Sequence, residues 1–112
     1  MKVAFEEIGR VGVSFASDSG EAGQVCKMIG NGKVAPCADG EDFIGVVEGI
    51  RKGICGVQIH GFAELAYTGN APGVGYVKLA ANGSGGVKVS ETGRAMLVVS
   101  VDETAKKATV EL

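Results

Sequence analysis

The feature of this sequence that most constrains its fold is a turn signal at roughly every 8–12 residues. Glycine, asparagine and aspartate mark these turns, among them Gly30-Asn31-Gly32, Asp39-Gly40 and Asn82-Gly83. Short apolar or alternating runs lie between them, and apolar residues do not recur at helical spacing between a cap and a terminal glycine. The pattern predicts an all-β fold without substantial helix: a small, turn-rich β-barrel or β-sandwich, since both have this strand spacing.

Ten segments are expected to form the strands. They are Arg10–Ala16, Gly23–Ile29, Lys33–Cys37, Asp42–Ile50, Ile54–Gly61, Phe62–Tyr67, Tyr76–Ala80, Gly86–Ser90, Ala95–Val101 and Lys107–Leu112. One of them contains the run MLVVSV, residues 96–101, which is apolar on both faces. Because a half-exposed strand alternates apolar and polar residues, this strand is expected to lie centrally between two layers or under another subunit.

The length of 112 residues predicts one domain. Residues 1–20 are the least regular part of the chain and are interpreted as an N-terminal strand or arm. The boundary is placed near the polar run Asp18-Ser19-Gly20-Glu21, and residues 21–112 are expected to form a single β domain.

The stretch Tyr67–Val89 contains six glycines, which raises the question of a phosphate-binding loop. A P-loop starting at Gly69 would require glycine where Val74 stands, and a dinucleotide fingerprint starting at Gly73 would require glycine where Lys78 stands. No helix is expected after either stretch to present its N-terminus to a phosphate. These glycines are therefore interpreted as turn residues, and the glycosylation sequon Asn82-Gly83-Ser84 as a chance match.

Few residues are candidates for catalysis. Cys55 and His60 are a possible thiol–imidazole pair, but their spacing of five puts them on opposite faces of a strand unless Gly56 forms a bulge. Cys55 is expected to face the core with Val57 and Ile59, and His60 to face water with Gln58. A single histidine argues against a catalytic triad or a multi-histidine metal site. Glu48 falls on an apolar face if its strand is regular, which suggests a raised pKa, a bulge near Gly45 or Gly49, or an arginine partner such as Arg51 or Arg94. We predict no enzyme, and no catalytic, cofactor-binding or metal-binding residues.

The charge pattern bears on the kind of partner. The chain has 11 basic and 13 acidic side chains, for a net charge of −2, and its longest basic run is Lys106-Lys107. Nucleic-acid binding requires a concentrated basic face, so it is not expected.

No apolar run is long enough for a membrane helix, and acidic residues occupy the place of a signal-peptide core, so we expect synthesis in the cytoplasm. Cys26, Cys37 and Cys55 lack Cys-x-x-Cys spacing and are interpreted as buried small hydrophobic residues.

Three motifs together resemble a known family. They are DGxxFIGVV from Asp39, VQIHGF from Val57 running into AYTGxAPxxGY, and VVSVDxTAKxxTV near the C-terminus. Over roughly Gly30 to Leu112, the chain resembles the capsid decoration proteins, also called head-stabilising or cement proteins, of phages and prophages. The resemblance rests on spacing and turn residues.

The resemblance implies a small all-β structural protein of the virion, synthesised in the bacterial host cytoplasm. It implies many copies on the outside of the phage head, contacts with the major capsid protein, and a homo-oligomer, with a trimer over local three-fold positions favoured. It also implies no catalysis and no cofactor. A mildly acidic surface suits the exterior of a shell better than an interior that faces DNA.

Three alternatives stay open at this point. Residues Met1–Phe15 are either an arm that adds a strand to a capsid edge, or a strand that pairs within its own barrel. The chain could instead be another virion β module, in a fibre or tail. It could also be a cytosolic β-barrel that binds a small ligand, for which Glu48 and Gln58 are the only polar residues to nominate.

Overall fold

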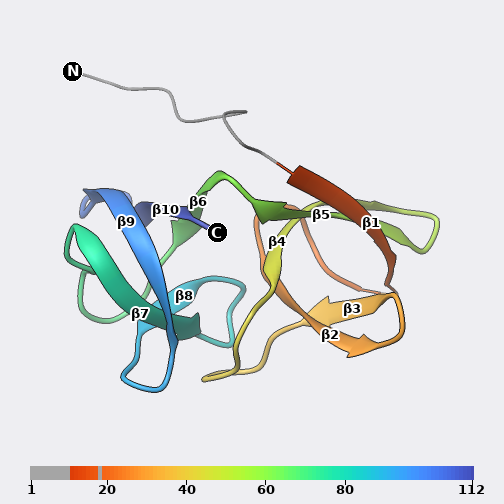
Figure 1. Ribbon diagram of the computed structural model, residues 1–112, viewed down its shortest axis with the longest axis horizontal. Coiled ribbons are helices and arrows are strands. Elements are labelled where there is room, and N and C mark those ends of the chain that lie inside the picture. The colour runs from red at the N-terminus through yellow and green to blue at the C-terminus, as the bar shows by residue number, and fades with distance from the viewer. Residues whose placement is uncertain (1–10, 18) are drawn as a thin grey trace.

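The computed structural model describes residues 11–17 and 19–112, and this part of the chain contains ten β-strands and no helix (Figure 1). Each of the ten segments expected from the sequence overlaps one strand, which confirms the all-β prediction. The strands are β1 (Val11–Ala16), β2 (Val25–Gly30), β3 (Lys33–Pro36), β4 (Gly45–Arg51), β5 (Ile54–His60), β6 (Phe62–Ala66), β7 (Gly75–Ala81), β8 (Val87–Val89), β9 (Arg94–Asp102) and β10 (Lys107–Glu111).

The strands form two sheets, one from each half of the chain. The first five close into a barrel in the order β1-β3-β2-β4-β5, and the last five form a sheet in the order β6-β10-β9-β7-β8. Figure 1 shows the barrel on the right and the sheet on the left. The sequence left barrel and sandwich open, and the structure has a closed barrel joined to a second sheet.

Strand β1 belongs to the barrel. It pairs antiparallel with β5 over six registered positions, and parallel with β3 through the single pair Ala16↔Lys33. The sequence left open whether this segment is an arm for a capsid edge or a strand of its own barrel, and residues 11–16 form a strand of the barrel. Residues 1–10 lie outside the described residues, and for them the arm hypothesis stays a prediction.

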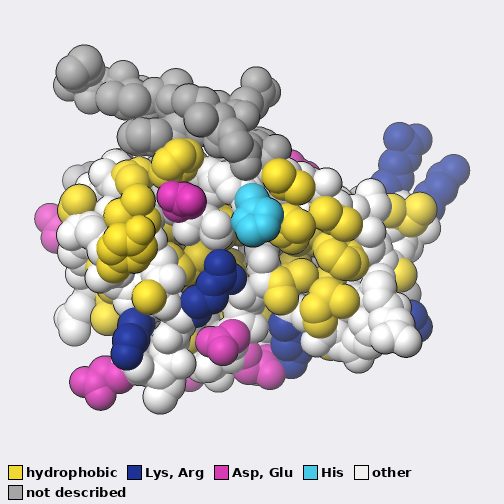
Figure 2. All heavy atoms as spheres, viewed as in Figure 1, with side chains coloured by type: hydrophobic (Ala, Val, Ile, Leu, Met, Phe, Trp, Pro, Cys, Tyr) yellow, Lys and Arg dark blue, Asp and Glu magenta, His cyan; other side chains and the backbone are white. Residues whose placement is uncertain are grey.

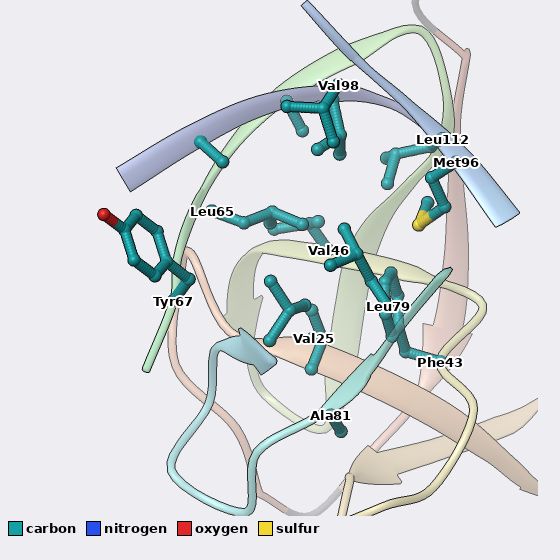
Figure 3. Packing of buried hydrophobic residues seen from close by; sticks show 14 of the residues in the cluster. Val25, Phe43, Val46, Leu65, Tyr67, Leu79, Ala81, Met96, Val98 and Leu112 are labelled. Carbon is teal, nitrogen blue, oxygen red and sulfur yellow. The ribbon is translucent and has the colours of Figure 1, made fainter. Parts of the chain in front are cut away.

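The larger hydrophobic core lies between the barrel and the sheet (Figure 3). Val25 and Val46 come from the barrel strands β2 and β4, whereas Leu65, Leu79 and Val98 come from the sheet, and all five are buried. We call this cluster the shared core. Burial of apolar surface is the main favourable term in folding, so the two halves stabilise each other.

A smaller cluster fills the barrel itself. Its buried members are Cys26, Val34, Val47, Cys55 and Val57. Consecutive residues of a strand point to opposite faces, so β4 sends one valine into the shared core and the next valine into the barrel. The wall formed by β4 is therefore covered on both sides.

Strand β9 is the central strand of its sheet. Met96 and Val98 on its inner face are buried in the shared core, and Leu97 and Val99 are half-buried. Leu97 lies in register with Tyr76 of β7 on one side and with Glu111 of β10 on the other. The inner face of β9 thus packs against the barrel, which is the second layer that the apolar run predicted. The apolar side chains on its outer face stay partly exposed to solvent.

Candidate functional site

The structure does not bring Cys55 and His60 together. Cys55 is fully buried inside the barrel, and its thiol lies 3.8 Å from the carbonyl oxygen of Gly56. His60 is exposed at the end of β5, where the chain crosses from the barrel to the sheet. The alternation of the strand separates the two side chains as the sequence predicts, so the geometry gives no thiol–imidazole pair.

Glu48 occupies a β-bulge. The register between β4 and β5 shifts between Val47 and Gly49, so Glu48 is the extra residue and its side chain is exposed. Its carboxylate reaches across the barrel wall to β1, because a Cβ built on Gly12 would lie 2.8 Å from Glu48 Oε1. Of the alternatives drawn from the sequence, the bulge near Gly49 is confirmed, and the position on an apolar face is wrong.

Gln58 is buried, contrary to the expectation that it lies on a wet face. It is 5% exposed, and its Nε2 donates to the carbonyl oxygens of His60 at 3.1 Å and Phe62 at 2.9 Å. Gln58 lies in register with Val46, whose side chain is in the shared core, and not with the residues that fill the barrel. The amide therefore ties down the crossing from β5 to β6, and neither Gln58 nor Glu48 lines the barrel interior.

The three cysteines are buried and carry free thiols, as the sequence interpretation requires. Burial raises the pKa of the Cys26 thiol to about 12 and that of Cys37 to about 11, and it also raises the pKa of Cys55. The thiolate is the reactive form, so these pKa values make all three side chains poor nucleophiles.

Alkylation tests this placement. In the folded protein at pH 8, iodoacetamide is expected to modify none of the three cysteines, because they are both inaccessible and protonated. In urea all three are expected to react, and intact-mass measurement distinguishes the two cases. Rapid modification of any cysteine in the folded protein would contradict its burial.

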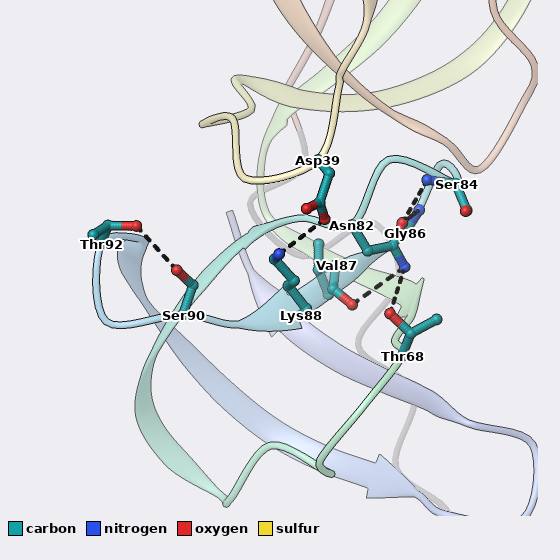
Figure 4. A network of polar contacts seen from close by, with 9 residues as sticks. All are labelled: Asp39, Thr68, Asn82, Ser84, Gly86, Val87, Lys88, Ser90 and Thr92. Atoms are coloured by element: carbon teal, nitrogen blue, oxygen red, sulfur yellow. Dashed lines mark hydrogen bonds and ion pairs between the residues drawn. The ribbon is translucent and has the colours of Figure 1, made fainter.

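Five of the six glycines in the stretch 67–89 lie in the loops before β7 and β8, and Gly75 begins β7. Asn82 organises the turn that precedes β8 (Figure 4). Its Oδ1 accepts hydrogen bonds from the amides of Ser84 at 2.8 Å and Gly86 at 3.1 Å. Its Nδ2 donates to Thr68 Oγ1 at 3.2 Å. The side chain of the sequon asparagine thus satisfies backbone groups of its own turn, in agreement with the turn interpretation.

The loop between β3 and β4 joins the barrel to the sheet. Asp39 of this loop lies 2.8 Å from Lys88 Nζ of β8, as Figure 4 shows. Glu41 binds Lys27 Nζ of β2 at 2.7 Å and accepts a hydrogen bond from the Ala38 amide at 2.6 Å. The hydrogen bond from Lys27, followed by that from Ala38, holds the pKa of the Glu41 carboxyl below its usual 4.5.

The lowered pKa of Glu41 predicts a pH dependence. Glu41→Gln is expected to unfold at a lower temperature than the wild type at pH 7, where the carboxylate is charged. A group whose pKa is lowered by folding stabilises the folded state above its unfolded pKa, and this contribution is lost as the pH falls. The two melting curves should therefore converge below pH 4.5. Glu91→Gln, in an exposed turn, is the control and should change little at either pH.

Exposed apolar side chains gather on two surfaces (Figure 2). Yellow side chains lie over β9 and β7 on the left, and over the barrel on the right beside the cyan His60. On the sheet, Tyr76 is 79% exposed and borders a shallow hollow of about 170 Å³ that Arg94, Leu97 and Glu111 also line. The hollow lies on the outer face of the sheet, among apolar and charged side chains.

Other kinds of site find little support in the described part of the chain. Residues 11–17 and 19–112 contain no group of three or more His, Cys, Asp or Glu side chains that could hold a metal ion. Within the same ranges, no helix is long and apolar enough to cross a membrane. The chain matches no protein-family model, and no curated protein is significantly similar to it.

Proposed function

We propose that this protein is a structural component of a phage or prophage virion that decorates the exterior of the head and stabilises it through contacts with the major capsid protein. The observation that carries the proposal is the concentration of exposed apolar side chains on two separate surfaces, one on the sheet and one on the barrel. Large exposed apolar patches on a small protein mark interaction sites. The resemblance to capsid decoration proteins over roughly Gly30 to Leu112 indicates that the partner is a phage head.

The outer sheet face suits contact between copies of the chain. Tyr76, Leu97, Glu111 and Phe62 lie in one cross-strand row over four strands, so the face presents a mixed apolar and polar surface. Aromatic side chains that combine a large apolar area with a polar tip are enriched at interfaces. We therefore assign this face to a homo-oligomer, for which the resemblance favours a trimer. The exposed apolar surface of the barrel is then free to contact the major capsid protein.

Deletion of the gene from the phage or prophage that encodes the chain tests the proposal. Heads assembled without the protein are expected to form, but to lose DNA at a lower temperature than wild-type heads, because contacts that bridge neighbouring capsid subunits are missing. Addition of the purified protein should restore the heat resistance. Unchanged heat resistance in the deleted strain, or failure of the protein to bind its heads, would contradict a stabilising role. Defects confined to tails or adsorption would favour the fibre or tail alternative.

A further inference from the structure

Two hairpin turns meet at one end of the barrel. The amide of Ala16 donates to the carbonyl oxygen of Gly32 at 2.8 Å, in the turn between β2 and β3. The next amide, that of Ser17, donates to the carbonyl oxygen of Gly53 at 3.0 Å, in the turn between β4 and β5. Because consecutive residues at the end of β1 bind one turn each, the two turns lie side by side, at the right-hand end in Figure 1.

This end of the barrel exposes large apolar side chains together with cations. Ile54 is 59% exposed and Ile29 is 58% exposed. The two turns with their flanking residues, 28–33 and 50–54, contain three basic side chains and no acidic one. In Figure 2, dark-blue side chains project from the β4–β5 hairpin on the right. We call this surface the hairpin rim; it consists of Met28, Ile29, Lys33, Ile50, Arg51, Lys52 and Ile54.

Strand register and one tight turn place the residues of the rim. The register pairs Arg51↔Ile54, Ile54↔Ala16 and Ala16↔Lys33 continue one row of residues across β4, β5, β1 and β3. At the tip, Lys52 has a φ of 51° and Gly53 has a φ of 77°. Positive φ at both central positions is the geometry of the tight hairpin turn that asparagine and glycine favour. A lysine is less favourable than asparagine or glycine in this conformation.

From this arrangement we infer that the hairpin rim is the surface that docks the protein onto the capsid, against a patch of the major capsid protein that is both acidic and apolar. The inference rests on the proposed function and names the surface that carries it out. The chain as a whole has a net charge of −2, so a local excess of cations selects an acidic partner surface by charge complementarity. The isoleucines supply the apolar area, and three cations are too few for a nucleic-acid interface, which needs a broad basic face.

Charge reversal at the rim, with a matched reversal elsewhere, tests the inference. The variant Arg51→Glu/Lys52→Glu changes two adjacent cations of the rim. The variant Lys106→Glu/Lys107→Glu makes the same change in charge at the turn between β9 and β10, at the left in Figure 1. Lys106 has a φ of 54°, so one residue of each pair has the same strained conformation. Both variants are compared by melting temperature before use, so that a folding defect is recognised.

Binding is measured by cosedimentation of the purified proteins with heads assembled without the protein. The rim variant is expected to bind at least about tenfold more weakly than the wild type, because its new carboxylates would repel the acidic surface that the cations attract. The control variant is expected to bind within about twofold of the wild type, because its charges lie outside the interface. Wild-type binding should also weaken as the salt concentration rises. Ile54→Ser provides a second rim variant without a change in charge, and it too should weaken binding.

Three results would overturn the inference. Equal binding by the rim and control variants, with the wild type bound to heads, would show that another surface docks while the decoration role stands. Failure of the wild type to bind heads at all would remove the proposed function and this inference with it. Rim-dependent binding to phosphatidylserine vesicles or to duplex DNA, without rim-dependent binding to heads, would identify a different class of partner.

Discussion

Replacement of Leu79 by alanine is expected to lower the free energy of unfolding by about 3–5 kcal/mol. Leu79 is fully buried in the shared core, where it lies between the sheet and the barrel (Figure 3). The substitution loses the burial of the side chain and leaves a cavity that the surrounding strands cannot fill. Chemical denaturation followed by far-ultraviolet circular dichroism measures the change. Because the core is shared, both halves should unfold in one transition.

Val74→Ala is the control for this prediction. Val74 is 74% exposed in the loop before β7, so its truncation should change the free energy of unfolding by less than about 0.5 kcal/mol. A loss below about 1 kcal/mol for Leu79→Ala would contradict the position of this side chain in the core. Two separate transitions, one for each half, would contradict the shared core itself.

Gly45→Ala is expected to have a comparable effect, a loss of about 3 kcal/mol, for a different reason. Gly45 lies in β4, opposite Cys26, where the strands approach closely. A Cβ at this position would overlap the backbone carbonyl oxygen of Gln58 and would lie 2.9 Å from Val57 Cγ1. The obstacle is the backbone of β5, which cannot rotate away as a side chain can. The strands would have to separate, and the same denaturation experiment measures the loss.

The same strand offers a matched control. A Cβ built on Gly49 meets no atom within 4 Å, and Gly49 is not among the glycines with positive φ. Gly49→Ala should therefore leave the free energy of unfolding within about 0.5 kcal/mol of the wild type. Equal losses at the two glycines would show that loss of glycine itself, and not close packing against β5, determines the effect.

The strands could be predicted because their signals are local. Alternating apolar residues and turn residues such as Asn31-Gly32 and Asn82-Gly83 act within a few positions of the chain, and each expected segment overlaps a strand. The arrangement of the strands could not be predicted. The barrel closes through Ala16↔Lys33 and through the pairing of β1 with β5, contacts between distant segments that leave no periodic trace in the sequence.

The errors over single residues have physical causes. Gln58 was expected on a wet face because alternation assumes one exposed side, whereas the wall made by β4 and β5 separates the barrel interior from the shared core. Glu48 was placed by regular alternation, and the bulge at Val47/Gly49 adds one residue to the strand. Gly45 and Gly49 were the local signals of a bulge in this strand, and the register shift lies next to Gly49. The hairpin rim was missed because barrel closure alone brings the turn at 30–32 beside the turn at 51–53.

The copy number of the protein in virions separates a decoration protein of the head from a minor virion component. Particles purified on a density gradient from the phage or induced prophage that encodes the chain are digested, and quantitative mass spectrometry compares this protein with the major capsid protein. For a decoration protein we expect a ratio near one copy per capsid subunit. A few copies per particle would indicate a fibre or tail component instead. Absence of the protein from purified particles would show that it is not a virion component.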